Sequence, residues 1–176
     1  MEKIKTVCDD KGIAIVVIPN IIFKNKQDID WEAVEKYLEE RIYDVVKNIE
    51  SQDTIYIGKR FAEEYSRSKD TRNARGARAK AKANAVQGIH EIVENATGRV
   101  FQNNKKKKHE KEAEHGWYYY TAHFALPQYE DGKKTNMYNV YRGRLVVNRS
   151  FNGKLFLYDL VDIKKEASNP LKISEW

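Results

Sequence analysis

Three stretches in the second half of the chain decide the fold: WYYYTAHFAL at 117–126, MYNVYRGRLVV at 137–147 and KLFLYDLVDI at 154–163. Each is rich in aromatic and β-branched residues, a composition typical of strands. Asp131-Gly132 and Asn152-Gly153 separate them, and both dipeptides are strong signals for hairpin turns. We therefore predict three consecutive antiparallel strands at about 117–126, 137–148 and 154–163.

The first half is expected to be mainly helical. After Asp30, a suitable N-cap, apolar residues recur at steps of three and four, which favours an amphipathic helix. Further on, an alanine-rich span without proline favours a long helix that stops at Gly98. The expected helices cover 31–50, 60–66 and 70–97, and the expected short strands cover 13–19 and 54–58. The prediction is an α+β fold, with helices packed on one face of a small antiparallel sheet that contains the C-terminal three-stranded meander.

The 176 residues are expected to form a single α+β domain. No internal repeat and no linker rich in proline, serine or glycine divides the chain. Within the domain we expect a helical half at about 1–98, a charged connector at 99–116 and a sheet half at 117–176.

The composition disfavours several classes of protein. A single cysteine excludes a disulfide framework and a Cys-based zinc site, and the nine glycines form neither GxGxxG nor GxxxxGK[ST]. No apolar run approaches the roughly 20 residues that cross a bilayer, and the first ten residues lack the apolar segment of a signal peptide. We expect no metal, no cofactor and no membrane association, and we place the protein in the cytoplasm.

Positive charge is clustered rather than merely in excess. The net charge is +6, and four consecutive lysines occupy 105–108. In a continuous helix over 70–97, Arg75, Arg78 and Lys82 would fall within roughly 60° of one another, on the side that becomes apolar further along. We therefore predict that they border a basic cleft beside the sheet. In the alternative, the helix breaks near Gly76 or Asn84 and the two halves lose their common face.

Arg142 and Arg144 are two positions apart in an expected strand, so they share one face of the sheet. If that face points away from the helices, it forms a basic, tyrosine-lined platform on which single-stranded nucleic acid could stack. The alternative is that these arginines pair with Asp159 or Asp162 on the next strand. Clustered charge favours RNA or DNA as the partner, and the expected nucleic-acid-binding residues are Arg75, Arg78, Lys82, Lys105, Lys106, Lys107, Lys108 and Arg144.

A metal-independent ribonuclease needs a base, an acid and cations near the phosphate. His109 is the first candidate for the base or acid, because it follows the lysine run and imidazole titrates near neutrality. Lys82 or Arg142 would stabilise the charge that develops on phosphorus. In the alternative, His109 lies in a solvated loop and has no role.

Several tracts together resemble one family: FAEEYSRSKDT, RGARAKAKANA, KHEKEAEHGWYYYTAHFALP, YNVYRGRLVV and GKLFLYDLVDIKKEASNPL. The chain resembles the large polyvalent protein-associated domains of the third type, found in phages and conjugative elements. The resemblance runs from about Ile15 to Leu171, and it implies action in a bacterial host cell. In the family these domains usually sit inside very large multidomain proteins, whereas this chain looks like a free-standing copy. The order of helices followed by sheet is similar to that of barnase-, EndoU-, colicin- and RelE-like ribonucleases, an analogy of fold alone. The family often has Arg where this chain has Tyr119 and His123, so a catalytic role of either would not be a family trait.

Three functions follow as alternatives. The first is a mobile-element protein that binds nucleic acid, with metal-independent ribonuclease activity as an extension. The second is a non-enzymatic anti-defence factor, which blocks a host immunity protein or sequesters a nucleotide messenger. The third is a structural accessory to DNA transfer or packaging. The sequence leaves the substrate and the oligomeric state open.

Overall fold

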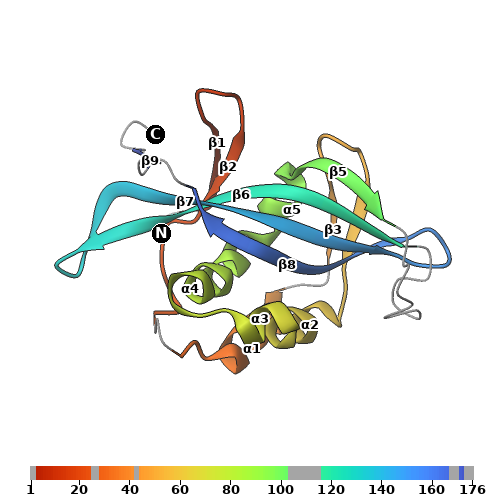
Figure 1. Cartoon of the computed structure of the whole chain (residues 1–176), viewed down its shortest axis with the longest axis horizontal. Coiled ribbons are helices and arrows are strands. Elements are labelled where there is room, and N and C mark those ends of the chain that lie inside the picture. The colour runs from red at the N-terminus through yellow and green to blue at the C-terminus, as the bar shows by residue number, and fades with distance from the viewer. Residues whose placement is uncertain (1–2, 25–27, 42–43, 103–115, 167–170, 173–176) are drawn as a thin grey trace.

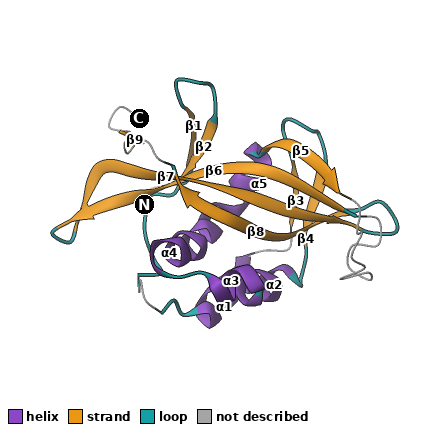
Figure 2. Ribbon diagram, viewed as in Figure 1, coloured by secondary structure: helices purple, strands orange, loops and turns teal. Residues whose placement is uncertain are grey.

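The computed structural model describes residues 3–24, 28–41, 44–102, 116–166 and 171–172. The fold is α+β (Figures 1 and 2). Its strands are β1 (Lys5–Cys8), β2 (Ala14–Val17), β3 (Asp44–Lys47), β4 (Thr54–Ile57), β5 (Thr97–Gln102), β6 (Trp117–Glu130), β7 (Lys133–Arg149), β8 (Leu155–Lys165) and β9 (Leu171–Lys172). Its α-helices are α1 (Trp31–Arg41), α2 (Phe61–Arg67), α3 (Lys69–Asn73), α4 (Gly76–Ala85) and α5 (Ile89–Asn95), and a 3-10 turn, η1 (Val86–Gly88), joins the last two.

The predicted C-terminal meander is confirmed. β6, β7 and β8 are consecutive antiparallel strands, and each extends beyond its predicted bounds. Asp131 and Gly132 both have positive φ angles, 51° and 76°, as a tight hairpin turn of the primed type requires. These three long strands are the frame on which the rest of the domain is assembled.

The sheet is larger than predicted, and it is mixed rather than antiparallel. Its strand order is β1-β2-β6-β7-β8-β4-β3, with β5 on β6 and β9 on β7. β2 runs parallel to β6, and β4 runs parallel to β8. The physical reason is that the hairpins β1–β2 and β3–β4 each add to one side of the meander. The connections from β2 to β6 and from β4 to β8 are long and include helices, which leaves the chain free to return in the parallel direction. The prediction of a small antiparallel sheet is therefore wrong in two respects: the sheet has more strands, and two of its strand pairs are parallel.

The predicted helix at 31–50 ends early. Asp30 caps it as expected, because its Oδ1 accepts a hydrogen bond from the Ala33 amide at 3.1 Å. α1 stops at Arg41, however, and Asp44–Lys47 forms β3, in which Val46 is buried against β4 while Val45 is half exposed. Three apolar residues at 45, 46 and 49 fit a helical and an extended pattern almost equally well, and pairing with β4 decides between them.

The predicted continuous helix over 70–97 is also wrong. Ala74 and Arg75 are extended and separate α3 from α4, which begins at Gly76 with a φ of 58°, and η1 separates α4 from α5. At the second break a side chain on Gly88 would come within 3.1 Å of the Val16 side chain, so the chain passes unusually close to β2 there. The connector predicted at 99–116 is extended at its start, because Thr97–Gln102 forms β5, and residues 103–115 lie outside the described structure.

The helices lie against one side of the strongly curled sheet and enclose the main hydrophobic core (Figure 1). Helices α2 and α4 contact β8, and α5 contacts β2, β3 and β6. Within the described parts of the chain, no helix is both long enough and apolar enough to cross a membrane. Among the described residues, no helix packs on the opposite side of β6 and β7, and this side holds the candidate site. Helices α2 and α3 border it at β8, where they line a depression together with Tyr158 and Val161.

Candidate nucleic-acid interface

Alternation along β6 sorts its side chains between the two sides of the sheet. Tyr120 and Phe124 are buried in the main core on the helical side. Tyr119, Thr121 and His123 occupy the intervening positions and therefore point to the other side, where each is partly exposed. The expected separation of the strand into a core side and an open side is thus present.

The strand register places cations beside these residues. Arg144 lies opposite Thr121 and Arg142 lies opposite His123, while Lys164 of β8 lies opposite Arg142. Directly opposed residues in an antiparallel pair point to the same side. Arg142, Arg144, Lys164 and Thr121 line a depression of about 440 Å³ on this side.

Aromatic rings extend the same surface. The Arg144 guanidinium lies 4.4 Å from the centre of the Tyr119 ring, a cation–π contact. Further along, the rings of Trp117 and Tyr158 meet edge to face at 5.1 Å. All three rings are partly exposed, unlike the aromatic residues of the core. We call the surface formed by Trp117, Tyr119, Thr121, Arg142, Arg144, Tyr158 and Lys164 the outer face.

Ion pairing on the outer face is partial. Arg144 Nη1 lies 3.4 Å from Asp162 Oδ2, and both side chains are about half exposed, at 49% and 54%. Arg142 and Lys164 have no carboxylate partner among the described residues. The alternative of arginines paired with the next strand therefore holds for Arg144 and Asp162 and not for Arg142.

His123 lies at the edge of the outer face, opposite Arg142. Its Nε2 lies 3.3 Å from Glu166 Oε1, and its side chain is mostly buried. Burial lowers the pKa of His123, and the nearby Glu166 carboxylate opposes that shift. The folded protein therefore favours the neutral imidazole near neutral pH.

This pKa shift predicts a pH dependence of stability. The unfolded chain binds a proton at His123 below its ordinary pKa of about 6.5, whereas the folded chain resists doing so. The His123 contribution is therefore complete above that pH and is lost as pH falls through the window below it. Denaturant unfolding from pH 5 to 7.5 should show a steeper loss of stability at low pH in the wild type than in His123→Gln. Parallel curves for the two proteins would contradict the assignment.

Lys82 is buried rather than exposed, contrary to its predicted place on a basic cleft. Its side chain is 0% exposed, and its Nζ lies 2.9 Å from Asp70 Oδ2 and 2.9 Å from Asp159 Oδ1. Burial raises the pKa of Asp159, and the Lys82 ammonium counteracts that shift. The ammonium is enclosed by two carboxylates that lie 12 residues before it and 77 residues after it, which the helical periodicity could not reveal.

Two aspartates connect this buried pair to the outer face. Arg78 pairs with Asp70, as Lys82 does. The Asp162 amide donates a hydrogen bond to Asp70 Oδ1 at 3.4 Å, and Asp162 in turn pairs with Arg144. The structure thus links Arg78, Lys82 and Arg144 in one network.

The remaining predicted residues lie apart from this network. Arg75 precedes α4, and its guanidinium donates to the carbonyls of Arg72 and Ala74. Lys105, Lys106, Lys107, Lys108 and His109 lie outside the described residues. Among the residues that are described, no three His, Cys, Asp or Glu side chains are placed to hold a metal ion.

The sequence analysis assigned no role in the site to Trp117, Tyr158 or Lys164. Alternation shows which residues of one strand share a side of the sheet. Deciding which residues of different strands lie on the same side also requires the register between the strands. The register of β7 and β8 shifts between Arg142 and Arg144 and again between Val146 and Val147. Counting from the turns would therefore have misplaced the β8 residues.

No protein-family model, curated protein or solved structure matches this chain. The resemblance to the polyvalent protein-associated domains therefore stays an expectation from sequence.

Proposed function

We propose that the outer face binds single-stranded RNA or DNA. The observation that carries this proposal is the combination, on one open side of three strands, of partly exposed rings with arginine and lysine. Arg142 and Lys164 lack carboxylate partners in the described structure, so phosphate groups would not have to displace an existing ion pair there.

Each kind of side chain has a distinct task in this proposal. Trp117, Tyr119 and Tyr158 provide surfaces for base stacking, a contact that accepts any base. Arg142, Arg144 and Lys164 contact phosphates, which contributes affinity without sequence specificity. Single strands fit such a surface better than a duplex does, because their bases are free to lie flat on the rings.

Binding is proposed here in preference to cleavage. Lys82, one of the expected catalytic cations, is enclosed by carboxylates on the helical side. Arg142 lies on the outer face beside His123, which is the histidine nearest to it among the described residues. Action within a phage or conjugative element belongs to the same proposal and rests on the sequence resemblance alone.

The experiment is a binding assay with fluorescently labelled single-stranded RNA, single-stranded DNA and duplex DNA across a salt series. If about three cations contact phosphates, the logarithm of the affinity should fall with the logarithm of salt with a slope of roughly −2, at about 0.7 per contact. Single strands should bind more tightly than duplex. The same samples, with and without EDTA, report whether RNA is cleaved. Absence of binding to every nucleic acid at low salt would refute the proposal and favour the protein-binding, anti-defence alternative.

A further inference from the structure

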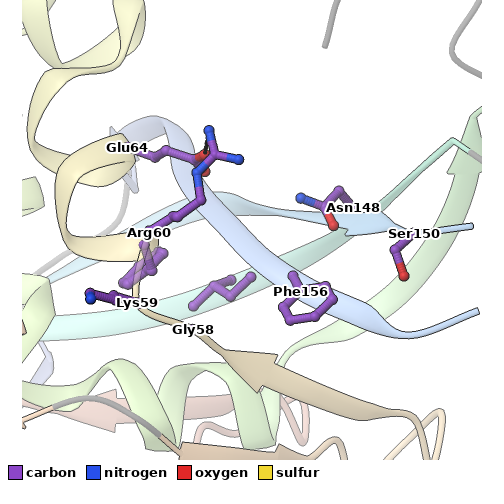
Figure 3. Close-up of a pocket in the computed structure, with 9 residues that line it drawn as sticks. Gly58, Lys59, Arg60, Glu64, Asn148, Ser150 and Phe156 are labelled. Atoms are coloured by element: carbon purple, nitrogen blue, oxygen red, sulfur yellow. Dashed lines mark ion pairs between the residues drawn. The ribbon is translucent and has the colours of Figure 1, made fainter. Parts of the chain in front are cut away.

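A second concave site lies beside the outer face, where β4 leaves the sheet and α2 begins. It is a cavity of about 240 Å³ between the β4–α2 turn and the adjoining ends of β7 and β8. Figure 3 shows Asn148, Ser150 and Phe156 on one side of it and Arg60 and Glu64 on the other. The volume is below the range of sites for drug-sized ligands and suits a single ring system.

Asn148 gives this cavity a specific polar group. The residue is 7% exposed, and its Oδ1 is buried and has no hydrogen-bond partner among the described residues. A buried amide oxygen without a partner destabilises the free protein, so native structures rarely keep one. Because Asn148 lines the cavity, a ligand that donates a hydrogen bond there would satisfy it.

A flat apolar wall lies next to this amide. Phe156 is opposite Asn148 in the β7–β8 register, so the two side chains share one side of the sheet. Gly58 lies close to the same ring, because a Cβ built on it would be 3.7 Å from Phe156, an ordinary van der Waals distance. Since Phe156 and Asn148 both line the cavity from one side of the sheet, a planar ring in the cavity could lie against Phe156 with its edge at Asn148.

Positive charge is placed at the opening. Lys59 and Arg60 follow Gly58 and line the cavity, and both are exposed. Arg60 Nη2 lies 3.4 Å from Glu64 Oε1, yet the Arg60 side chain is 69% exposed. These groups favour an anion at the opening, on the same ligand whose ring occupies the interior.

We propose that this cavity binds a nucleoside phosphate, with the base between Phe156 and the Asn148 amide and the phosphate beside Lys59 and Arg60. An amide carries both an acceptor and donors, which complements the edge of a base. This inference goes beyond the proposed function, because none of these residues belongs to the outer face. The ligand is a free nucleotide or one nucleotide of a bound strand, and both share the chemistry described.

The test is titration of the full chain with AMP, GMP, CMP and UMP, followed by calorimetry and by amide NMR shifts. At least one nucleotide should bind the wild type and shift the amides of Gly58, Asn148 and Phe156. Asn148→Val should weaken that binding at least about fivefold, the lower end of what an amide–base contact provides. Asn148→Val should also unfold at a temperature equal to or above that of the wild type, because it removes the unpartnered oxygen.

Two further variants keep the outcome decisive. Phe156→Leu keeps apolar bulk but removes the flat ring, so it should weaken binding as well, whereas Asn136→Val, at an exposed site on β7, should not. Wild-type affinity in both Asn148→Val and Phe156→Leu, or no binding of any mononucleotide or 5′-phosphorylated dinucleotide by the wild type, overturns the proposal. Binding of the dinucleotide alone identifies the strand as the source. Arg142→Ala/Arg144→Ala should bind mononucleotides normally, which separates this proposal from that of the outer face.

Discussion

Replacing Lys82 with methionine is expected to lower the free energy of unfolding by about 3–5 kcal/mol, the usual cost of removing one member of a buried ion pair. Lys82 is fully enclosed, and its ammonium lies 2.9 Å from a carboxylate oxygen of each of two aspartates, Asp70 and Asp159. Arg78 still accompanies Asp70 in the variant, but Asp159 would remain buried without a cation. Burial already raises the pKa of Asp159, and loss of Lys82 raises it further.

Urea unfolding at several pH values measures this effect. The deficit of Lys82→Met should grow as pH rises above the ordinary pKa of an aspartate, because the unfolded chain ionises Asp159 more readily than the folded variant does. Lys69→Met, an exposed lysine of α3, is the matched control and should change stability by less than about 0.5 kcal/mol. The double variant Lys82→Met/Asp159→Leu should recover most of the lost free energy of unfolding, because no buried carboxylate then remains without a cation at position 159. Equal stability of Lys82→Met and Lys69→Met would show that the pair is not buried in solution.

Replacing Arg142 and Arg144 together with alanine is expected to weaken single-strand binding roughly 25-fold at 0.1 M salt, if each arginine releases about 0.7 of a counterion. The salt slope should become shallower by about 1.4 for the same reason. Both arginines lie on the outer face and line the same depression, so their contacts would be lost together. Anisotropy titrations over a range of salt concentrations measure affinity and slope in one experiment.

The control for this variant removes the same charge from elsewhere. Lys36 and Arg41 are exposed on α1, which belongs to the helical side of the domain. Lys36→Ala/Arg41→Ala should keep the wild-type slope and most of the affinity. If both double variants lose affinity equally, net charge rather than the outer face accounts for binding.

The meander was predictable because its signals are local. Aromatic and β-branched runs separated by Asp131-Gly132 and Asn152-Gly153 determine strand, turn and strand without reference to distant residues. The helix cap at Asp30 was predictable for the same reason, because Asp30 accepts its hydrogen bond from the Ala33 amide, which is only three residues away.

The remainder of the sheet depends on distant pairing. Val46 joins a strand because Ile55 lies opposite it, and β2 and β4 run parallel to β6 and β8 because helices carry the chain across. The spacing of apolar residues within a short stretch of sequence reveals neither of these pairings. The break at Gly76 was foreseeable only as an alternative, because a glycine in a helical pattern is compatible with continuation as well as termination.

The candidate site was partly predictable. Arg142 and Arg144 share a side through their spacing alone, and none of the described helices covers that side at these two positions. Lys82 was misplaced because its two carboxylate partners come from α3 and β8, and only the folded arrangement shows that they enclose it. Tyr158 and Lys164 required the irregular register of β7 and β8.

The most direct measurement of the central proposal is photo-crosslinking of the full chain to a single-stranded oligonucleotide containing 4-thiouridine, followed by peptide mapping. Stacking on the outer face predicts crosslinks at Trp117, Tyr119 and Tyr158, and these should decrease as salt is added. Arg142→Ala/Arg144→Ala should reduce their yield, whereas Lys36→Ala/Arg41→Ala should not. Crosslinks confined to helices α1 to α4, with none on β6, β7 or β8, would contradict the proposal that the outer face binds nucleic acid.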